Sequence, residues 1–316
     1  MDAPATATGR GRIVFSSSGT QTRATGTTPS TREGSLFSAL TSGINGLATA
    51  LFATVFPDDC RLCGNPLRNI SRLPVCEECI LAMRPVTGAL CSVCGERLGG
   101  PYRLSVASGD ALCGLCRRLE PPFVKSAAYG SYEGGLRELI HLLKYNQVRP
   151  AANVLGRMVA EAISDLQPLF AGPPVLLVPV PLHARKFRQR SFNQAELIAR
   201  SALKLLPGTD LRLSCAVLER TRETKSQIGL SRHQRRENMR GAFAVVKPEE
   251  VSGHEVLLLD DVFTTGTTVS ECARVLRRAG ASKVYVATVA RTLKAEAQHV
   301  MPPADVEGEV AMAAHG

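Results

Sequence analysis

The sequence predicts an α/β domain, built as a parallel sheet with helices on both faces, preceded by a small cysteine-rich region. After Phe123, short apolar runs alternate with segments of helical period. Before that point, eight cysteines form four C-x-x-C pairs. Of the 316 residues, 44% are apolar and 21% charged, so the chain can bury a sizeable core and does not have the composition of a disordered protein.

The α/β domain is expected to span residues 121–292. Its apolar runs predict strands at 175–180, 255–260 and 283–290. Its helical periods predict helices at 135–145, 151–166, 192–206 and 268–279.

The sequence predicts no folded domain for residues 1–57. Residues 1–33 are rich in Thr, Ser, Gly and Ala and have no apolar secretion signal, so we expect a disordered head, with an organellar transit peptide as the alternative. Residues 34–57 carry no charge, and their strongest apolar residues follow one helical stripe. This predicts an amphipathic helix that docks on a partner rather than a transmembrane span, with contact at a membrane surface as the alternative. We expect a flexible tail at 293–316 and a cytoplasmic protein.

The positive charge is concentrated in one stretch. The chain has a net charge of +10. Residues 180–240 contain 14 Lys or Arg and 5 Asp or Glu, a net of +9. Such a surplus favours polyanionic partners, namely nucleic acid, phosphorylated metabolites or anionic lipid. Solvated basic helix faces are the alternative. Aromatic residues are only 5% of the chain, which leaves few platforms for base stacking.

The four C-x-x-C pairs predict metal binding. Two residues between thiolates let both sulfurs reach one tetrahedral zinc ion, and two pairs complete a closed structural site. The segments that begin at Cys60 and Cys91 share the pattern C-x-x-C-G-x-x-L, which indicates a duplicated zinc ribbon over residues 58–120. The candidate ligands are Cys60, Cys63, Cys76, Cys79, Cys91, Cys94, Cys113 and Cys116. Sequential pairing is predicted, interleaved pairing also fits the spacing, and we expect the ribbons to have cores separate from that of the α/β domain.

The segment from Val256 to Thr268 predicts a phosphate site. An apolar strand runs into Asp260 and Asp261, then into a hydroxyl-rich loop, then into a helix. Backbone N–H groups at a helix N-terminus bind phosphate, and carboxylates at the carboxyl end of a strand can accept hydrogen bonds from sugar hydroxyls. The candidate phosphate-binding residues are Thr264, Thr265, Gly266, Thr267 and Thr268. A ribose 5-phosphate carries both features, whereas the structural alternative is an Asp-Asp turn before a Thr-rich cap.

Two basic segments accompany this site. The turn Val178-Pro179-Val180-Pro181 leads into four cations and then into Ser191-Phe192-Asn193-Gln194. These cations are Arg185, Lys186, Arg188 and Arg190. The second segment has the polar, basic character of a mobile lid that excludes water. Its candidate lid and DNA-binding residues are Gln227, Arg232, Arg235, Arg236 and Asn238. We expect both basic segments to approach one edge of the sheet and to bind single-stranded DNA without strong sequence preference.

The loop after the acid pair resembles the phosphoribosyl-pyrophosphate signature of type I phosphoribosyltransferases. Together with the paired cysteine knuckles, Lys144-Tyr145, the V-P-V-P turn and the R-x-F-N-Q box, it resembles the competence protein F (ComF) family over roughly residues 56–291. The resemblance implies a type I phosphoribosyltransferase-like sheet, phosphoribosyl pyrophosphate bound with Mg²⁺, and a pyrophosphate loop at Arg185, Lys186 and Arg190. It makes Asp260 and Asp261 the candidate catalytic pair. Ser191 departs from the family, in which glycine is usual at this position.

The resemblance implies two alternative functions. The first is the handling of single-stranded DNA in natural transformation, in which the helix at 34–57 would contact a protein of the competence machinery. The second is nucleotide salvage, in which a base is joined to ribose 5-phosphate with loss of pyrophosphate. We expect the first function, and whether the protein turns over a substrate stays open.

Overall fold

The computed structural model describes residues 59–67, 71–99, 111–172, 174–224 and 231–293. The expected head, the helix at 34–57, Gln227 and nearly all of the expected tail lie outside these residues. Among the described residues, no helix is long and apolar enough to cross a membrane.

A parallel five-stranded sheet forms the centre of the α/β domain, with strand order β1-β7-β6-β2-β3. A separate antiparallel pair, β4–β5, lies outside it. The strands are β1 (Lys125–Ser131), β2 (Val175–Pro179), β3 (Leu211–Leu213), β4 (Leu218–Arg220), β5 (Phe243–Val245), β6 (Glu255–Phe263) and β7 (Lys283–Arg291). The fold class predicted from the sequence is confirmed.

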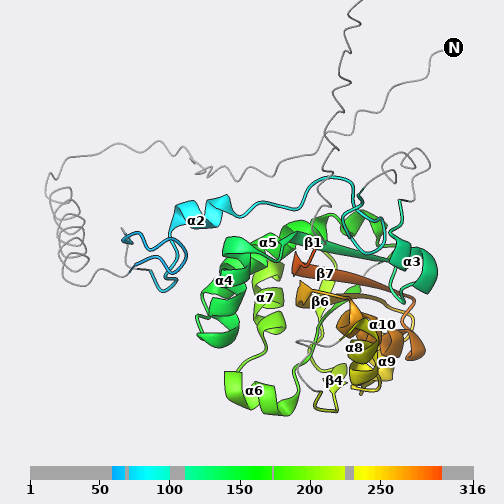
Figure 1. Cartoon of the computed structure of the whole chain (residues 1–316). Helices are drawn as coiled ribbons and strands as arrows, with labels where there is room; N and C mark the ends of the chain where they lie inside the picture. Colours follow the sequence, from blue (N-terminus) through cyan, green and yellow to red (C-terminus); the bar gives the residue numbers. More distant parts are fainter. Residues whose placement is uncertain (1–58, 68–70, 100–110, 173, 225–230, 294–316) are drawn as a thin grey trace, which may run out of the picture. The chain divides into compact units, whose positions relative to one another are not determined.

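The helices cover both faces of this sheet (Figure 1). The helices of the described residues are α2 (Glu77–Ala82), α3 (Gly114–Leu119), α4 (Gly134–Tyr145), α5 (Ala151–Ser164), the 3₁₀ turn η2 (Gln167–Leu169), α6 (Ala184–Arg190), α7 (Gln194–Leu203), α8 (Arg232–Met239), α9 (Pro248–Val251) and α10 (Thr267–Arg278). Helices α4, α5 and α7 lie on one side, and α8, α9 and α10 on the other.

The core has two halves because successive side chains of β6 point to opposite faces of the sheet. Leu257 and Leu259 pack in the half that contains α4, α5 and α7. Val256 and Leu258 pack in the half that contains α10 and the β4–β5 pair. The four helices expected in this domain and the three expected strands are all present, with ends shifted by at most three residues.

The zinc-ribbon region shares these two core halves. Cys60 and Met83 belong to the half with α4 and α5, and Cys91 and Cys94 to the half with α10. Backbone hydrogen bonds also connect the two regions: Val86 donates to Tyr129 (2.6 Å), and Ser126 donates to Val93 (2.7 Å). The expectation of separate cores is therefore wrong, because the small ribbons bury their apolar residues against the larger domain.

Candidate functional site

The predicted phosphate loop, residues 264–266, connects β6 to α10. Strand β6 extends through both acids to Phe263, three residues beyond the expected end. Gly266 is the N-cap of α10 with φ of 75°, in the left-handed region that glycine adopts without strain. A Cβ atom at this position would lie 2.5 Å from Cζ of Phe263, so only glycine fits against this ring. The Thr265 and Thr267 hydroxyls lie 2.8 Å apart and form one hydrogen bond.

The two acids of the pair lie on opposite faces of β6, because strand side chains alternate. Asp261 is buried and forms an ion pair with Lys144 at the end of α4. Asp260 faces the half of the core that contains α10. Burial raises its pKa to about 6, although the charges of Lys144 and Arg220 act in the opposite direction. The pair therefore offers two carboxylates with different surroundings, and Asp260 is the less completely neutralised one.

Lys144 is the cation nearest this pair. The pKa of Lys144 is lowered to about 8, mainly by burial; the charge of Asp260 opposes this shift, and the charges of Arg190 and Lys186 add to it. At neutral pH the ammonium form still dominates, because its pKa lies above 7. Lys144 therefore stabilises the carboxylate of Asp261 and contributes positive charge to the same edge of the sheet.

The predicted basic turn is the short helix α6, which directly follows β2. The Arg190 guanidinium lies over the ring of Tyr145, 5.3 Å from its centroid, and donates to Oε1 of Gln194 (2.9 Å). Arg185 pairs with Glu223 at 3.2 Å. Burial and repulsion by Arg220 lower the pKa of Lys186. Two cations of α6, Lys186 and Arg190, thus act electrostatically on Lys144.

Ser191 ends α6 in the left-handed conformation, with φ of 62°. Its N–H donates to the carbonyl of Phe187 at 2.7 Å, which is the cap geometry usually made by glycine. The substitution therefore keeps the turn and strains the backbone rather than redirecting the chain before Asn193.

The predicted lid residues Arg232, Arg235, Arg236 and Asn238 lie in α8, which packs against α10. Arg236 lines a cleft of about 260 Å³ together with Thr264, Thr265 and Gly266 of the phosphate loop. The structure thus brings α8 to the phosphate loop. Lid movement stays a prediction.

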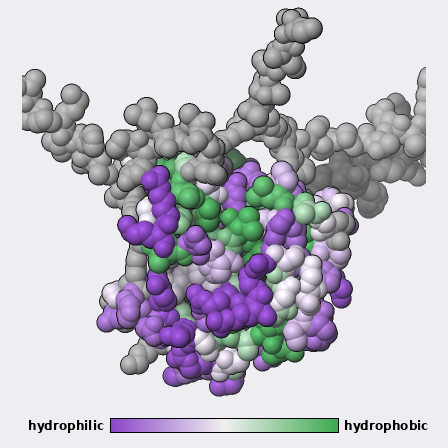
Figure 2. All heavy atoms as spheres, turned by 90° about the vertical axis from the view of Figure 1, so that its right-hand side faces the viewer, coloured by the Kyte–Doolittle hydropathy of each residue, from purple (hydrophilic) through white to green (hydrophobic). Residues whose placement is uncertain are grey.

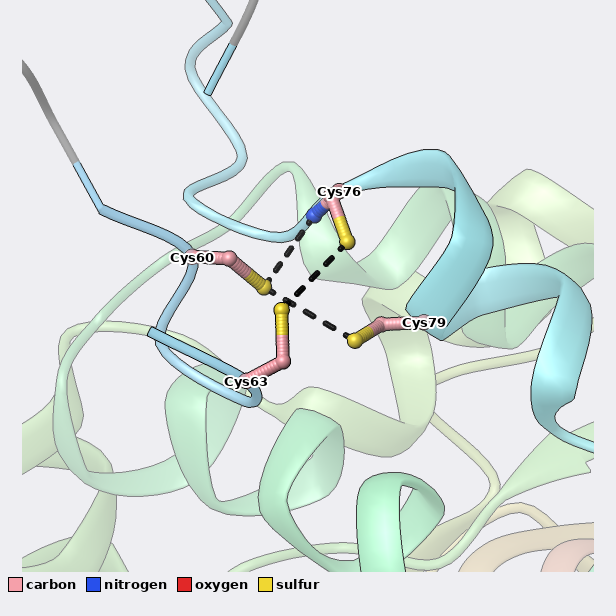
Figure 3. A group of neighbouring side chains, drawn as sticks. All are labelled: Cys60, Cys63, Cys76 and Cys79. Carbon is pink, nitrogen blue, oxygen red and sulfur yellow. Dashed lines mark hydrogen bonds between the residues drawn. The ribbon is translucent and has the colours of Figure 1, made fainter. Parts of the chain in front are cut away.

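The eight cysteines form two sets of four (Figure 3 shows the first). The sets are Cys60, Cys63, Cys76, Cys79 and Cys91, Cys94, Cys113, Cys116, so the sequential pairing is the one present. A tetrahedral zinc with bonds of about 2.3 Å separates its sulfurs by about 3.8 Å. The sulfur–sulfur distances of 3.9 Å for Cys60–Cys79, 3.8 Å for Cys63–Cys76 and 3.7 Å for Cys94–Cys113 fit this geometry. Four thiolates with no open position fit a structural zinc in each set.

The two ribbons repeat the same local structure. The Cys76 N–H donates to Sγ of Cys60, and the Cys113 N–H donates to Sγ of Cys91, each at 3.3 Å. Gly64 and Gly95 both have positive φ, at 75° and 68°, as expected for the turn after each first knuckle. A short helix, α2 or α3, then begins after Cys76 or Cys113. These matching contacts confirm the duplication.

One cysteine in each set has a pKa below the ordinary value of a thiol. A hydrogen bond from Cys94 outweighs the effect of burial and lowers the pKa of Cys91 to about 4. Burial raises the pKa of Cys60, but backbone N–H donors, led by that of Cys76, outweigh it and lower the pKa to about 6.

Three functional candidates were not predicted as site residues. Lys144 pairs with Asp261, Arg220 lies near Asp260, and Arg291 contacts the second cysteine set. The role of Lys144 could have been predicted from the Lys144-Tyr145 pair, which is one of the motifs that resemble the ComF family. No motif in the sequence indicates a role for Arg220 or Arg291, since each acts on residues distant in sequence.

Comparisons with known proteins agree with this two-part organisation. Residues 51–117 match the family model of a double zinc ribbon domain, and residues 193–310 that of a phosphoribosyl transferase domain. The chain is 32% identical over 238 residues to the DNA utilization protein YhgH of Escherichia coli (strain K12), covering 75% of this chain and 98% of that protein. It is 31% identical over 224 residues to competence protein F of Haemophilus influenzae, covering 68% of this chain and 96% of that protein. A solved structure titled "Structure of the allosteric regulatory enzyme of purine biosynthesis" shares 25% identity over 45% of this chain and 26% of that one, with a TM-score of 0.28.

Proposed function

Since this chain belongs to the competence protein F family, in which a double zinc ribbon precedes a phosphoribosyltransferase domain, we propose that it binds phosphoribosyl pyrophosphate and handles single-stranded DNA during DNA uptake. The names of its relatives, competence protein F and DNA utilization protein, support a role in using imported DNA.

The observation that carries the ligand proposal is the junction of β6, the phosphate loop and α10. The N-terminus of α10 offers backbone N–H groups to a 5-phosphate, and Gly266 allows close approach. Asp260 can accept hydrogen bonds from the ribose hydroxyls, while the α6 cations face the pyrophosphate. Mg²⁺, a cation that prefers oxygen ligands, would enter bound to the pyrophosphate and reduce its charge.

Titration calorimetry with Mg²⁺ and phosphoribosyl pyrophosphate tests the site. Asp260→Asn should weaken binding by about 1–3 kcal/mol, because charge-assisted hydrogen bonds are lost. Asp210→Asn is a matched control, since Asp210 is exposed and distant in sequence from the loop. Equal binding by all three proteins, or no binding by any, would refute the ligand assignment. Pyrophosphate release with a panel of bases would establish the salvage enzyme as the function instead.

The DNA proposal rests on the surface of α6. Its four cations are accompanied by two exposed aromatic side chains, Phe187 (47% exposed) and Tyr145 (66%). Aromatic side chains beside a basic track bind single strands by stacking on bases, at about 1–3 kcal/mol per base. The small number of aromatic residues in the chain is therefore offset by the position of these two.

A second basic surface lies beside α10. Figure 2, which views the molecule from the right-hand side of Figure 1, shows many hydrophilic residues on that face. A groove of about 620 Å³ is lined there by Arg274, Arg277, Arg278 and Lys283. Arg274 pairs with Glu271 and Lys283 with Glu255, so two of these four charges are already neutralised. This groove therefore has less charge available for phosphates than α6, and we place the DNA on α6.

Salt-dependent binding of a labelled oligonucleotide tests this placement. Each phosphate neutralised by the protein contributes about −0.7 to the slope of log affinity against log salt. Arg188→Gln together with Arg190→Gln should weaken binding and flatten the slope for every sequence alike. The double control Arg118→Gln with Arg278→Gln removes the same charge from other exposed positions and should change the slope less. An unchanged slope in the α6 variant, with loss of phosphoribosyl pyrophosphate binding, would assign these cations to the small ligand alone.

A further inference from the structure

The second cysteine set contacts a buried arginine of the central sheet. Arg291, the last residue of β7, is 4% exposed. Its Nη2 donates to Oε2 of Glu96 at 3.2 Å and to Sγ of Cys94 at 3.6 Å. Its Nε and Nη1 have no hydrogen-bond partner among the described residues. This guanidinium therefore depends on one carboxylate and one metal-binding sulfur for its polar contacts.

The first set is different. Among the described residues, the hydrogen bonds to its sulfurs come from backbone N–H groups and from other cysteines, without an arginine or lysine. It is also more accessible, since Cys63 is exposed, whereas three of the four cysteines of the second set are buried. The duplicated ribbons thus surround their metal sites unequally.

The same guanidinium contacts the phosphate loop through Phe263. It lies over the ring of Phe263 at 4.3 Å from the centroid, and the two residues are partners in the β6–β7 register. Phe263 in turn packs so closely under Gly266 that a Cβ atom there would not fit. A continuous chain of contacts therefore runs from Cys94 through Arg291 and Phe263 to the N-cap of α10.

We propose that Arg291 is an outer-shell partner of the second zinc site and that it couples zinc at this site, but not at the first, to the conformation of the phosphate loop. A zinc bound by four thiolates has a net charge of −2, which the buried guanidinium partly offsets. Outer-shell partners of this kind typically change metal affinity by about 10- to 100-fold. The coupling half of this proposal rests on the proposed binding of phosphoribosyl pyrophosphate.

The outer-shell role is tested by the rate at which the full-length protein releases zinc to a chelator, followed with a metal indicator. We expect zinc release to show two kinetic phases, with the slower phase from the second site. Cys63→Ser and Cys113→Ser each remove one site and so identify the phase of the other. Arg291→Gln should accelerate the slow phase by about 10- to 100-fold and leave the fast phase unchanged. Arg61→Gln, at an exposed arginine of the first ribbon, is the matched control and should change neither.

Arg291→Lys provides a second variant that keeps the charge. A lysine cannot reproduce the planar fork that reaches Glu96 and Cys94 while covering Phe263, so its slow phase should lie between those of the wild type and Arg291→Gln. Equal release from both sites in the wild type, with no change in either Arg291 variant, would overturn the outer-shell role.

The coupling is tested on the wild-type protein, because linkage is reciprocal. If zinc at the second site favours the ligand-bound loop, saturating Mg²⁺ and phosphoribosyl pyrophosphate must raise the equilibrium zinc affinity of the second site, measured by competition with the chelator, and leave that of the first site unchanged. A zinc affinity that is insensitive to a ligand shown by calorimetry to bind would overturn the coupling. A ligand that does not bind at all would refute the proposed function together with the coupling, and the zinc measurements without ligand would still decide the role of Arg291.

Discussion

Replacing Asp260 by asparagine should stabilise the protein while it weakens the site. Burial raises the pKa of Asp260 from 3.8 to about 6, a difference of about two units. Each unit corresponds to about 1.4 kcal/mol, so keeping this carboxylate ionised in the folded state costs up to about 3 kcal/mol at neutral pH. Asparagine has no charge to bury, and its Oδ1 can still accept the Asp261 N–H that Asp260 accepts at 2.9 Å.

The pH dependence has a definite sign. Because the folded pKa is higher than the unfolded one, the folded state binds more protons between pH 4 and 6, and the wild type loses stability as pH rises through this window. The gain in Asp260→Asn should therefore be small near pH 4 and complete above pH 7, at about 1–3 kcal/mol or roughly 2–12 °C in Tm.

Thermal unfolding of the wild type and the variant at matched pH values from 5 to 8.5 measures this gain. Any loss of zinc at the lower pH values affects both proteins and cancels in the difference. Asp210→Asn, at an exposed carboxylate, should change stability by less than about 0.5 kcal/mol. A destabilised Asp260→Asn, or a gain that does not vary with pH, would refute the assignment of Asp260 as a partly buried, poorly compensated charge.

Three further outcomes follow from the geometry. Gly266→Ala should destabilise the protein by about 2–4 kcal/mol in denaturant titration, because its Cβ would overlap Phe263 and its φ is positive. It should also abolish binding of phosphoribosyl pyrophosphate at the phosphate loop. Unchanged stability would contradict this packing. Ser191→Gly should stabilise by about 0.5–1 kcal/mol, because glycine relieves the left-handed strain at the end of α6, and a loss of stability would show that the serine side chain is needed there. Removal of zinc by a chelator should lower the Tm of the whole described fold, since Cys60 and Cys91 belong to the two halves of the core. An unchanged calorimetric transition of the α/β domain would contradict a shared core.

The local features of the site were predictable from the sequence. The strand, acid pair, glycine and helix between Val256 and α10 are contiguous, so their order alone places them at one edge of a sheet. The C-x-x-C spacing likewise identifies the metal ligands, because each knuckle is a local turn.

The remainder depends on contacts between residues distant in sequence. Arg291 and Cys94 are separated by 197 positions, and no spacing rule connects them. Strand β1 was not predicted because Ala127, Ala128 and Gly130 are small residues of low β propensity, and it forms at the sheet edge by pairing with β7. The shared core was missed for the same reason, since the ribbons look self-contained in sequence and become part of a larger core only in three dimensions.

Asp260 and Asp261 have different surroundings because adjacent side chains of a strand point to opposite faces of the sheet. Asp261 points toward α4, where Lys144 neutralises it, so removal of either partner would leave a buried charge and cost about 3–5 kcal/mol. Asp260 points to the opposite face, where burial outweighs the charges of Lys144 and Arg220 and its pKa stays raised. A ligand that brings hydroxyl donors or Mg²⁺ to Asp260 would offset this burial cost. Mg²⁺ with phosphoribosyl pyrophosphate should therefore raise the Tm of the wild type more than that of Asp260→Asn at pH 7.5. An equal increase in both proteins would show that the ligand does not contact Asp260.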